Sequence, residues 1–233
     1  MLKIYLKTAL RGLRKSKGHS AINIAGLSIG MAVSLLIAIW IWDEVSFNRS
    51  IPHYDRIARV MQHTTVNGEK RTSDVVPFPL SDELRTHYGS NFTYVVMSTW
   101  AGGHIVTVGG KKVSQKGAYM EAEAPKMLSL DMLRGTRDGI REGSTVLLAA
   151  STAKAIFGDA DPVGQVLNID KQVNVKVTGV YRDLPENSQF KDYGFIGSWE
   201  AYKESEPGLK GMDDPWGLNA WMIYCEKIGR AHV

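Results

Sequence analysis

The sequence predicts an α+β protein attached to a membrane by one helix. Residues 21–42 contain the charge-free run Ile22–Trp42, whose 21 residues as a helix would span roughly 31 Å at about 1.5 Å per residue, enough to cross a bilayer. Further on, short strand-like and helix-like segments mix without a regular β-α-β rhythm, which argues against a doubly wound sheet. We therefore expect a cytoplasmic segment at 1–20, a transmembrane helix at 21–42 and an outward mixed α/β domain at 43–227.

The charge distribution orients the helix. Six of the 28 Lys and Arg residues precede residue 20, where there is no acidic residue, and Asp43-Glu44 follows the apolar run. The positive-inside rule therefore places the N-terminus in the cytoplasm. The remaining 22 basic residues face 24 acidic ones, so a nucleic-acid partner is not expected. A cleaved signal peptide is the alternative, but its apolar region is normally shorter and ends at a small-residue cleavage site.

Two patterns near the helix predict contacts with lipid. The first residues alternate apolar and basic at helical spacing, which predicts an amphipathic helix on the inner membrane surface. Its apolar positions are Leu2, Leu6, Ala9, Leu10 and Leu13, and its basic positions are Lys3, Lys7, Arg11 and Arg14. The alternatives are an ordinary flanking helix with solvated charges, or docking on a cytoplasmic partner. At the other end, Trp40 and Trp42 suit the outer interfacial belt.

Small residues within the apolar run predict a packing face. Gly26, Ser28 and Gly30 would let another helix approach closely. Glycine is also common in membrane helices that only contact lipid, so both interpretations stay open.

The outward domain is predicted to contain short strands and helices. A strand follows Asp55-Arg56, and Asn67-Gly68 is typical of a tight hairpin turn. The other expected strands are Tyr94–Ser98, His104–Val108, Lys112–Ser114, Thr145–Ala149, and a hairpin of 164–170 with 172–181 whose Val173, Val175, Val177 and Val180 face the core. The expected helices are Ser81–Tyr88 with Ser81 as N-cap and Gly89 as stop, Pro125–Leu133, and Ser151–Phe157 closed by Gly158.

No pattern predicts catalysis, a cofactor or a metal. The single cysteine, Cys225, excludes an intrachain disulfide and a cysteine zinc cluster. The six histidines are scattered singly, and Gly109-Gly110-Lys111-Lys112 lacks the spacing of a phosphate-binding loop. No nucleophile-elbow motif occurs, although a Ser/His/Asp triad stays possible because its members need not be adjacent.

Several segments together resemble one protein family. Residues 1–60 resemble the opening of MacB/FtsX-like ABC transporter permeases, and 129–135 (SLDMLRG), 151–164 (STAKAIFGDADPVG) and 177–188 (VTGVYRDLPENS) look like that family's periplasmic core domain. The positions that carry the motifs, with an expected structural role, are Asp43, Glu44, Asp55, Arg56, Phe157, Gly158, Pro162, Gly164, Gly179 and Pro185. Asn48, Ser50 and Ala58 depart from the pattern, where an Asp, an aromatic residue and a Tyr are common.

The resemblance also implies that the chain is a fragment. Such permeases continue to three further membrane helices, so 43–227 would be a periplasmic core domain incomplete at its C-terminus. Residues 228–233 (IGRAHV) are what a short-read sequencing adapter would encode before a stop, so we expect them to be a non-native tail.

By this resemblance the chain would be a non-catalytic permease subunit in the bacterial inner membrane. It would form a homodimer or heterodimer, bind an ABC ATPase on a separate chain, and couple ATP hydrolysis to periplasmic movement for export of antibiotics, peptides or lipoproteins. A periplasmic adaptor and an outer-membrane duct assist some relatives. Residues 3–17 would lie near the ATPase, 26–30 would pack within the permease, and 43–59 would form a stalk.

Two other functions are open. A single-pass anchored periplasmic binding or sensor protein would require the chain to be complete, and an anchored hydrolase has no motif in its favour. The sequence leaves the transported substrate, the ATPase and the oligomeric state undetermined.

Overall fold

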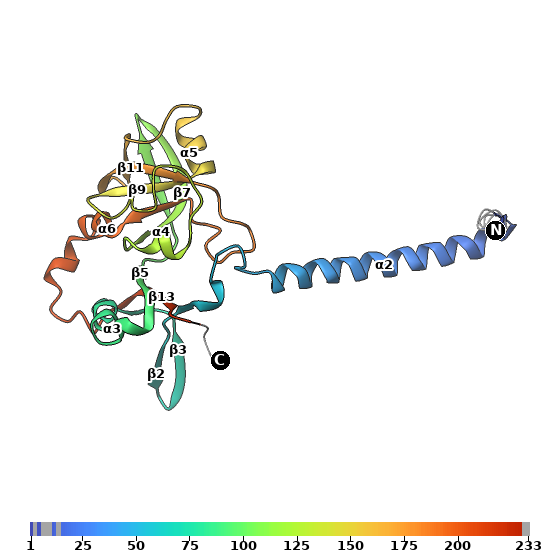
Figure 1. The fold of residues 1–233 in the computed structure, drawn as a ribbon, viewed down its shortest axis with the longest axis horizontal. Helices are drawn as coiled ribbons and strands as arrows, with labels where there is room; N and C mark the ends of the chain where they lie inside the picture. Colours follow the sequence, from blue (N-terminus) through green and yellow to red (C-terminus); the bar gives the residue numbers. More distant parts are fainter. Residues whose placement is uncertain (2–3, 6–10, 13–14, 230–233) are drawn as a thin grey trace. The chain divides into compact units, whose positions relative to one another are not determined.

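A computed structural model describes residues 1, 4–5, 11–12 and 15–229 of the 233-residue chain. The chain divides into two compact units, Met1–Phe47 and Asn48–Val233 (Figure 1).

The first unit contains one long helix, α2 (Lys17–Val45), which is longer at both ends than the expected 21–42. No proline interrupts it, and none of its 29 residues is buried. The helix stops at Ser46, whose main-chain N–H donates to Trp42 O at 2.9 Å. Most of the predicted amphipathic helix lies outside the described residues, namely Leu2, Lys3, Leu6, Lys7, Ala9, Leu10, Leu13 and Arg14.

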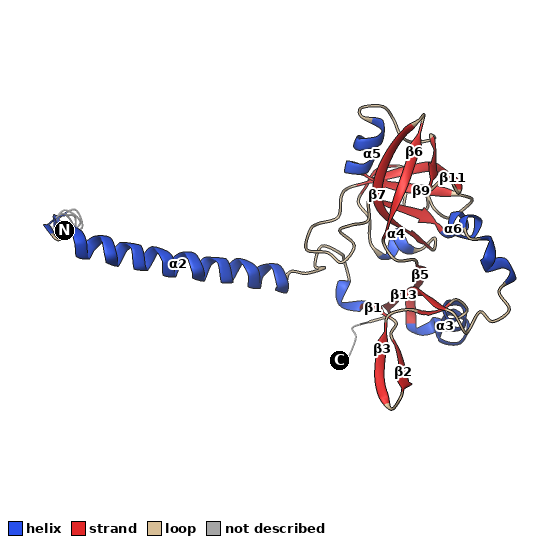
Figure 2. Cartoon of the chain, turned by 180° about the vertical axis from the view of Figure 1, so that it is seen from behind, coloured by secondary structure: helices blue, strands red, loops and turns tan. Residues whose placement is uncertain are grey.

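The second unit is built around a closed ring of six strands. In order round the ring these are β6 (Gly102–Val108), β7 (Lys111–Met120), β12 (Phe195–Ser198), β9 (Thr145–Ala149), β11 (Val173–Tyr181) and β10 (Val166–Ile169), which pairs back to β6. The pairs β7–β12 and β9–β11 are parallel and the other four are antiparallel. A short strand, β8 (Met132–Arg134), adds to β11. We call this part the barrel (Figure 2).

The same sheet continues beyond the barrel from β7. It runs through β5 (Phe92–Ser98) to the central β13 (Asn219–Lys227) and then to β1 (Ile57–Arg59), with β4 (Val76–Pro77) beside the start of β13. Both β1 and β5 are antiparallel to β13. Since helix α3 (Leu80–Tyr88) connects β1 to β5, this is a split β-α-β unit, and we call it the split sheet.

The remaining elements are short. The hairpin β2 (Gln62–Val66) and β3 (Glu69–Ser73) forms a separate two-stranded sheet, and both turn residues have positive φ (Asn67 at 53° and Gly68 at 83°), as the Asn-Gly signature predicts. The other helices are η1 (Tyr54–Arg56), η2 (Gly89–Asn91), α4 (Ala124–Met127), α5 (Ala150–Phe157), α6 (Trp199–Ser205) and η3 (Pro207–Gly211).

Apolar side chains fill both parts. The predicted core valines of β11 are all buried, and their spacing changes where a register shift between Val177 and Gly179 turns the strand. Strand β13 is buried on both faces: Trp221 and Ile223 belong to the cluster next to α3, and Met222 and Tyr224 belong to a cluster on the opposite face. The α+β prediction without a doubly wound sheet is confirmed.

Several local predictions were wrong. The expected helix Pro125–Leu133 is only the four-residue α4, because Ser129 adopts a left-handed φ of 49° and leads into β8. Ser81 is buried inside the first turn of α3 and does not cap it, and Gly89 stays right-handed and continues into η2. The strand predicted at Lys112–Ser114 extends over 111–120. Strands β12 and β13 and helix α6 were not predicted.

Candidate functional site

Residues 48–59, which begin the second unit, are bound by several contacts within that unit. We call these residues the exit segment. Asn48 donates its main-chain N–H to Asn187 O at 2.8 Å, and its side-chain Oδ1 accepts from Gln189 N–H at 2.9 Å. Its φ of 60° lies in the left-handed region, which asparagine and aspartate tolerate better than most residues. An aspartate, common here in the resembled family, would keep the same acceptor.

Further contacts fix the rest of the exit segment. Ile51 is only 3% exposed and packs in the hydrophobic core. Arg56 lies 3.4 Å from the carboxylate of Glu226, whose side chain is 6% exposed, and Arg59 lies 2.9 Å from Asp74. Since Ile57–Arg59 also pairs with the central β13, main chain and side chains together bind this segment to the split sheet.

The split sheet and the barrel meet at a narrow junction. Strand β5 pairs with β7 at one position, Ser98 opposite Met120, and Glu121 N–H donates to Met97 O at 3.1 Å just beyond it. Strand β7 ends there, and beyond it two side chains form hydrogen bonds with the main chain of β5. Glu121 Oε2 accepts from Met97 N–H at 2.6 Å, while Arg85 Nη2 donates to Val95 O at 2.9 Å.

Arg85 and Glu121 also bind each other, so a helix of the split sheet is tied to the end of a barrel strand. Asp82 lies 2.8 Å from Arg85 on the exposed side. Burial raises the pKa of Glu121, and the Arg85 guanidinium and the Met97 N–H offset only part of that rise. Without these two partners the carboxylate would be strongly disfavoured at this position.

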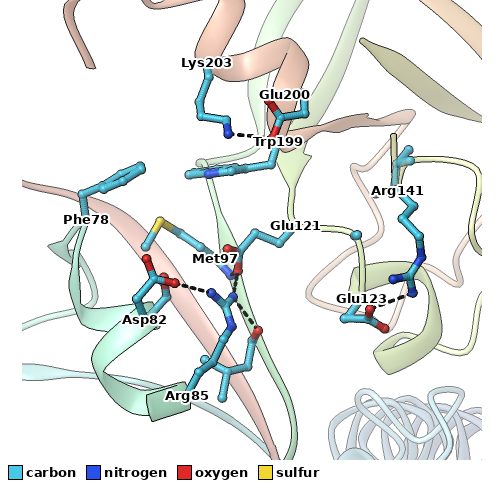
Figure 3. A pocket seen from close by; sticks show the side chains of 14 residues that line it. Phe78, Asp82, Arg85, Met97, Glu121, Glu123, Arg141, Trp199, Glu200 and Lys203 are labelled. Carbon is cyan, nitrogen blue, oxygen red and sulfur yellow. Dashed lines mark hydrogen bonds and ion pairs between the residues drawn. The ribbon is translucent and has the colours of Figure 1, made fainter. Parts of the chain in front are cut away.

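A cleft of about 540 Å³ opens at the junction, lined by α3, β5, the turn after β7 and α6 (Figure 3). We call it the junction cleft. Trp199 of α6 stacks on Phe78 with ring centroids 6.1 Å apart and forms an apolar wall. Around this wall lie ion pairs, with Lys203 2.6 Å from Glu200 and Arg141 2.8 Å from Glu123. The cleft thus combines a strand edge, an aromatic surface and paired charges.

Two other titratable groups, His104 and Cys225, lie outside the junction cleft. His104 Nδ1 lies 2.6 Å from Asp170, and the imidazole packs edge-on against Tyr119 and Phe195. Burial raises the pKa of the Cys225 thiol to about 11. Within the described part of the chain, no three His, Cys, Asp or Glu side chains are grouped so that they could hold a metal ion.

The structure places the predicted membrane residues on α2. Gly26 and Gly30 are four residues apart and share a face, but Ser28 lies about 200° round the helix from Gly26 at 100° per residue. Ser34 lies on the Gly30 side and donates its Oγ to Gly30 O at 2.9 Å. The small-residue face is therefore better described with Ser34 in the place of Ser28.

The predicted interface residues are exposed where they are described. Trp40 and Trp42 are 65% and 75% exposed in the outer part of α2, and Asp43 and Glu44 lie in its last turn. Arg11 is also exposed, whereas Lys3, Lys7 and Arg14 lie outside the described residues.

The family-motif residues of the barrel lie at turns and close approaches. Phe157 ends α5, and Gly158 follows with a φ of 64° and donates its N–H to Lys154 O. Pro162 O accepts from Gln165 N–H in the turn that contains Gly164. A side chain at Gly179 would come within 2.7 Å of Arg134 O, and Pro185 O accepts from Ser188 N–H in the loop before β12.

The sequence motifs indicated the exit segment but not the junction cleft. Of the motif residues, Asp55 and Arg56 lie in the exit segment, and none lines the junction cleft. Sequence reasoning missed Arg85, Glu121 and Trp199. Arg85 and Glu121 are 36 positions apart, and no local pattern brings them together.

A long apolar helix followed by a barrel and a split sheet defines the class of protein: an anchor helix with a folded domain beyond it. Among the described residues α2 is the one helix long and apolar enough to cross a membrane. The chain belongs to the family of the MacB-like periplasmic core domain, whose model matches residues 20–223.

Solved structures share the fold. A domain assigned to a permease of Porphyromonas gingivalis matches with a TM-score of 0.63 and 19% identity over 78% of this chain and 77% of that one. The periplasmic region of MacB from Actinobacillus actinomycetemcomitans has a TM-score of 0.54 and 17% identity over 76% and 77%. The extracellular domain of the noncanonic ABC-type transporter YknZ from Gram-positive bacteria has a TM-score of 0.53 and 13% identity over 74% and 84%. No curated protein matches the chain by sequence.

Proposed function

We propose that the chain is a non-catalytic permease subunit of a MacB/FtsX-type ABC transporter, in which ATP hydrolysis on a separate ATPase chain moves the periplasmic domain. Family membership and the candidate membrane-spanning helix support this proposal. The observation that carries it is the exit segment, where Asn48, Ile51 and Arg56 bind the domain directly after the helix. A displacement of Asn48 would therefore reach β13 and the loop before β12.

The proposal includes the partners and the cellular location. The permease would be a homodimer or heterodimer in the bacterial inner membrane, with an ABC ATPase at its cytoplasmic end and, in some systems, a periplasmic adaptor and an outer-membrane duct. Its cargo would be antibiotics, peptides or lipoproteins. The face of α2 that contains Gly26 and Gly30 would pack within the permease, because two glycines one turn apart let helices approach closely.

Photo-crosslinking in cells tests the ATPase partner. Replacing the exposed Arg11 by a photoreactive amino acid should capture an ABC ATPase, and the same replacement at Thr65 in the exposed β2–β3 hairpin should not. Capture from Thr65, or from neither position, would contradict the permease proposal.

Cysteine labelling tests the topology on the same cells. A membrane-impermeant maleimide should label Thr65→Cys in intact cells and Ser16→Cys only after lysis, and the native Cys225 is buried and provides a low background. The reverse order of labelling would overturn the proposed orientation.

A single-pass periplasmic binding or sensor protein is the second candidate, and the junction cleft of about 540 Å³ favours it. That function needs no ATPase, so the Arg11 crosslink separates the two candidates.

A further inference from the structure

Strand β5 has one closed edge and one open edge. Along one edge it pairs with β13 from Phe92 to Ser98. Along the other it pairs with β7 only at Ser98, and among the described residues no strand pairs with the remainder of that edge. An open strand edge is a template for another strand, and proteins normally cover it.

Two side chains form the hydrogen bonds along this edge that a neighbouring strand would otherwise form. Glu121 Oε2 accepts from Met97 N–H, as a neighbouring carbonyl would, and Arg85 Nη2 donates to Val95 O, as a neighbouring N–H would. Because main-chain groups alternate sides along a strand, Val95 and Met97, two positions apart, both direct their N–H and C=O toward this edge.

The junction cleft provides space along the edge. It borders Val95 and Met97 directly, and neighbouring strands need a separation of only about 4.8 Å. Beyond this edge, Trp199 and Phe78 offer an aromatic surface for an apolar side chain (Figure 3). The charges around the cleft are already paired, so recognition would depend on main-chain hydrogen bonds rather than on the charge of the ligand.

We propose that the open edge of β5 binds an extended segment of a partner polypeptide by strand addition, with the segment's main chain replacing Glu121 and Arg85 at Met97 N–H and Val95 O. In the unbound protein these side chains protect the edge. The inference goes beyond the proposed function and holds whether or not an ATPase drives the domain.

The test measures binding of a peptide probe to the full chain in detergent micelles. The probe is a fluorescent, end-blocked heptapeptide of alternating threonine and valine with a lysine at each end, followed by anisotropy. A twin carries N-methyl groups on every interior amide, so neither of its edges can donate main-chain hydrogen bonds. Strand addition predicts that this twin binds about tenfold or more weakly, since each lost hydrogen bond costs roughly that factor. Equal binding of the two peptides would overturn the proposal.

Matched variants locate the site. Arg85→Ala frees Val95 O and should bind the probe more tightly. Arg141→Ala breaks a different ion pair at the junction cleft and should bind the probe like the wild type. If Arg85→Ala does not fold, as judged by circular dichroism, the N-methyl comparison on the wild-type chain decides. Absence of binding to both the wild type and Arg85→Ala also overturns the proposal.

Discussion

The side-chain oxygen of Asn48 accepts a hydrogen bond from the main chain of Gln189 at 2.9 Å, across 141 positions of sequence. Asn48 is the first residue of the second unit, and Gln189 lies in the loop that leads into β12. The point where the chain enters the domain is thus bound to a loop that continues into the barrel.

We expect Asn48→Ala to lower the free energy of unfolding by about 1–2 kcal/mol, because it loses the acceptor for Gln189 N–H and strains a left-handed backbone. Asn48→Gly should cost less, since it relieves the backbone but not the hydrogen bond, and Asn48→Asp should cost least. Urea denaturation of the four chains checks this order. Equal stability of the alanine and aspartate variants would show that the hydrogen bond contributes nothing.

Because the pKa of Glu121 is raised, the difference in unfolding free energy between the wild type and Glu121→Gln should depend on pH. The folded chain binds the proton at a higher pH than the unfolded chain, whose carboxyl has its ordinary value of 4.5. This contribution to stability is therefore complete below that value and is lost as the pH rises through the folded pKa. Denaturation at pH 4 and pH 7 should show the wild type gaining relative to the variant at pH 4, and the opposite trend would contradict the assignment.

Substitutions at two glycines distinguish the cost of backbone strain from the cost of a steric clash. Gly135 (φ 72°) and Gly164 (φ 88°) both have left-handed backbones, but a side chain at Gly135 would overlap Thr178 O while one at Gly164 meets open space. We expect Gly164→Ala to cost about 1 kcal/mol and Gly135→Ala about 1–3 kcal/mol more. Thermal melts of the two variants give the comparison, and equal melting temperatures would exclude the steric contribution.

Cys225 should not react with a thiol reagent at pH 8 until the chain unfolds, because it is 2% exposed and its pKa is raised from 9.0 to about 11. Between these values the unfolded thiol loses its proton first, so rising pH favours unfolding. The loss of stability between pH 9 and pH 11 should be smaller in Cys225→Ala. Rapid labelling of the native chain would show that β13 opens locally.

Parts of the fold could be predicted because their signals are local. The β2–β3 turn depends on Asn67-Gly68, and the end of α5 depends on Gly158. By contrast, Ser81 has the chemistry of a cap but is buried by packing of α3 on the sheet, so tertiary structure overrides the local pattern. Strand β13 had a usable signal, because Trp221–Cys225 is a continuous apolar run of the kind found in strands buried on both faces.

Of the candidate site, only the exit segment could be predicted from the sequence. The exit segment follows the apolar helix and carries family motifs such as Asp55-Arg56, so both the helix and the resemblance indicated it. The junction cleft exists because β7 ends at Met120 while β5 continues toward Phe92, and that offset depends on pairing between distant strands. No residue pattern around Arg85 or Trp199 encodes it.

The pairing of Ile57 with Glu226 also sets an order for folding during synthesis. The barrel strands lie between Gly102 and Ser198, so the barrel can close before β13 has left the ribosome. Strand β1 is made early but pairs with β13, the last strand in the described part of the chain, and non-local pairings of this kind form slowly. Until then the segment that follows α2 lacks its strand partner, as most of β5 also does, so chaperones and proteases can reach both. Pulsed proteolysis of stalled nascent chains should therefore cut near Ile57 until β13 emerges.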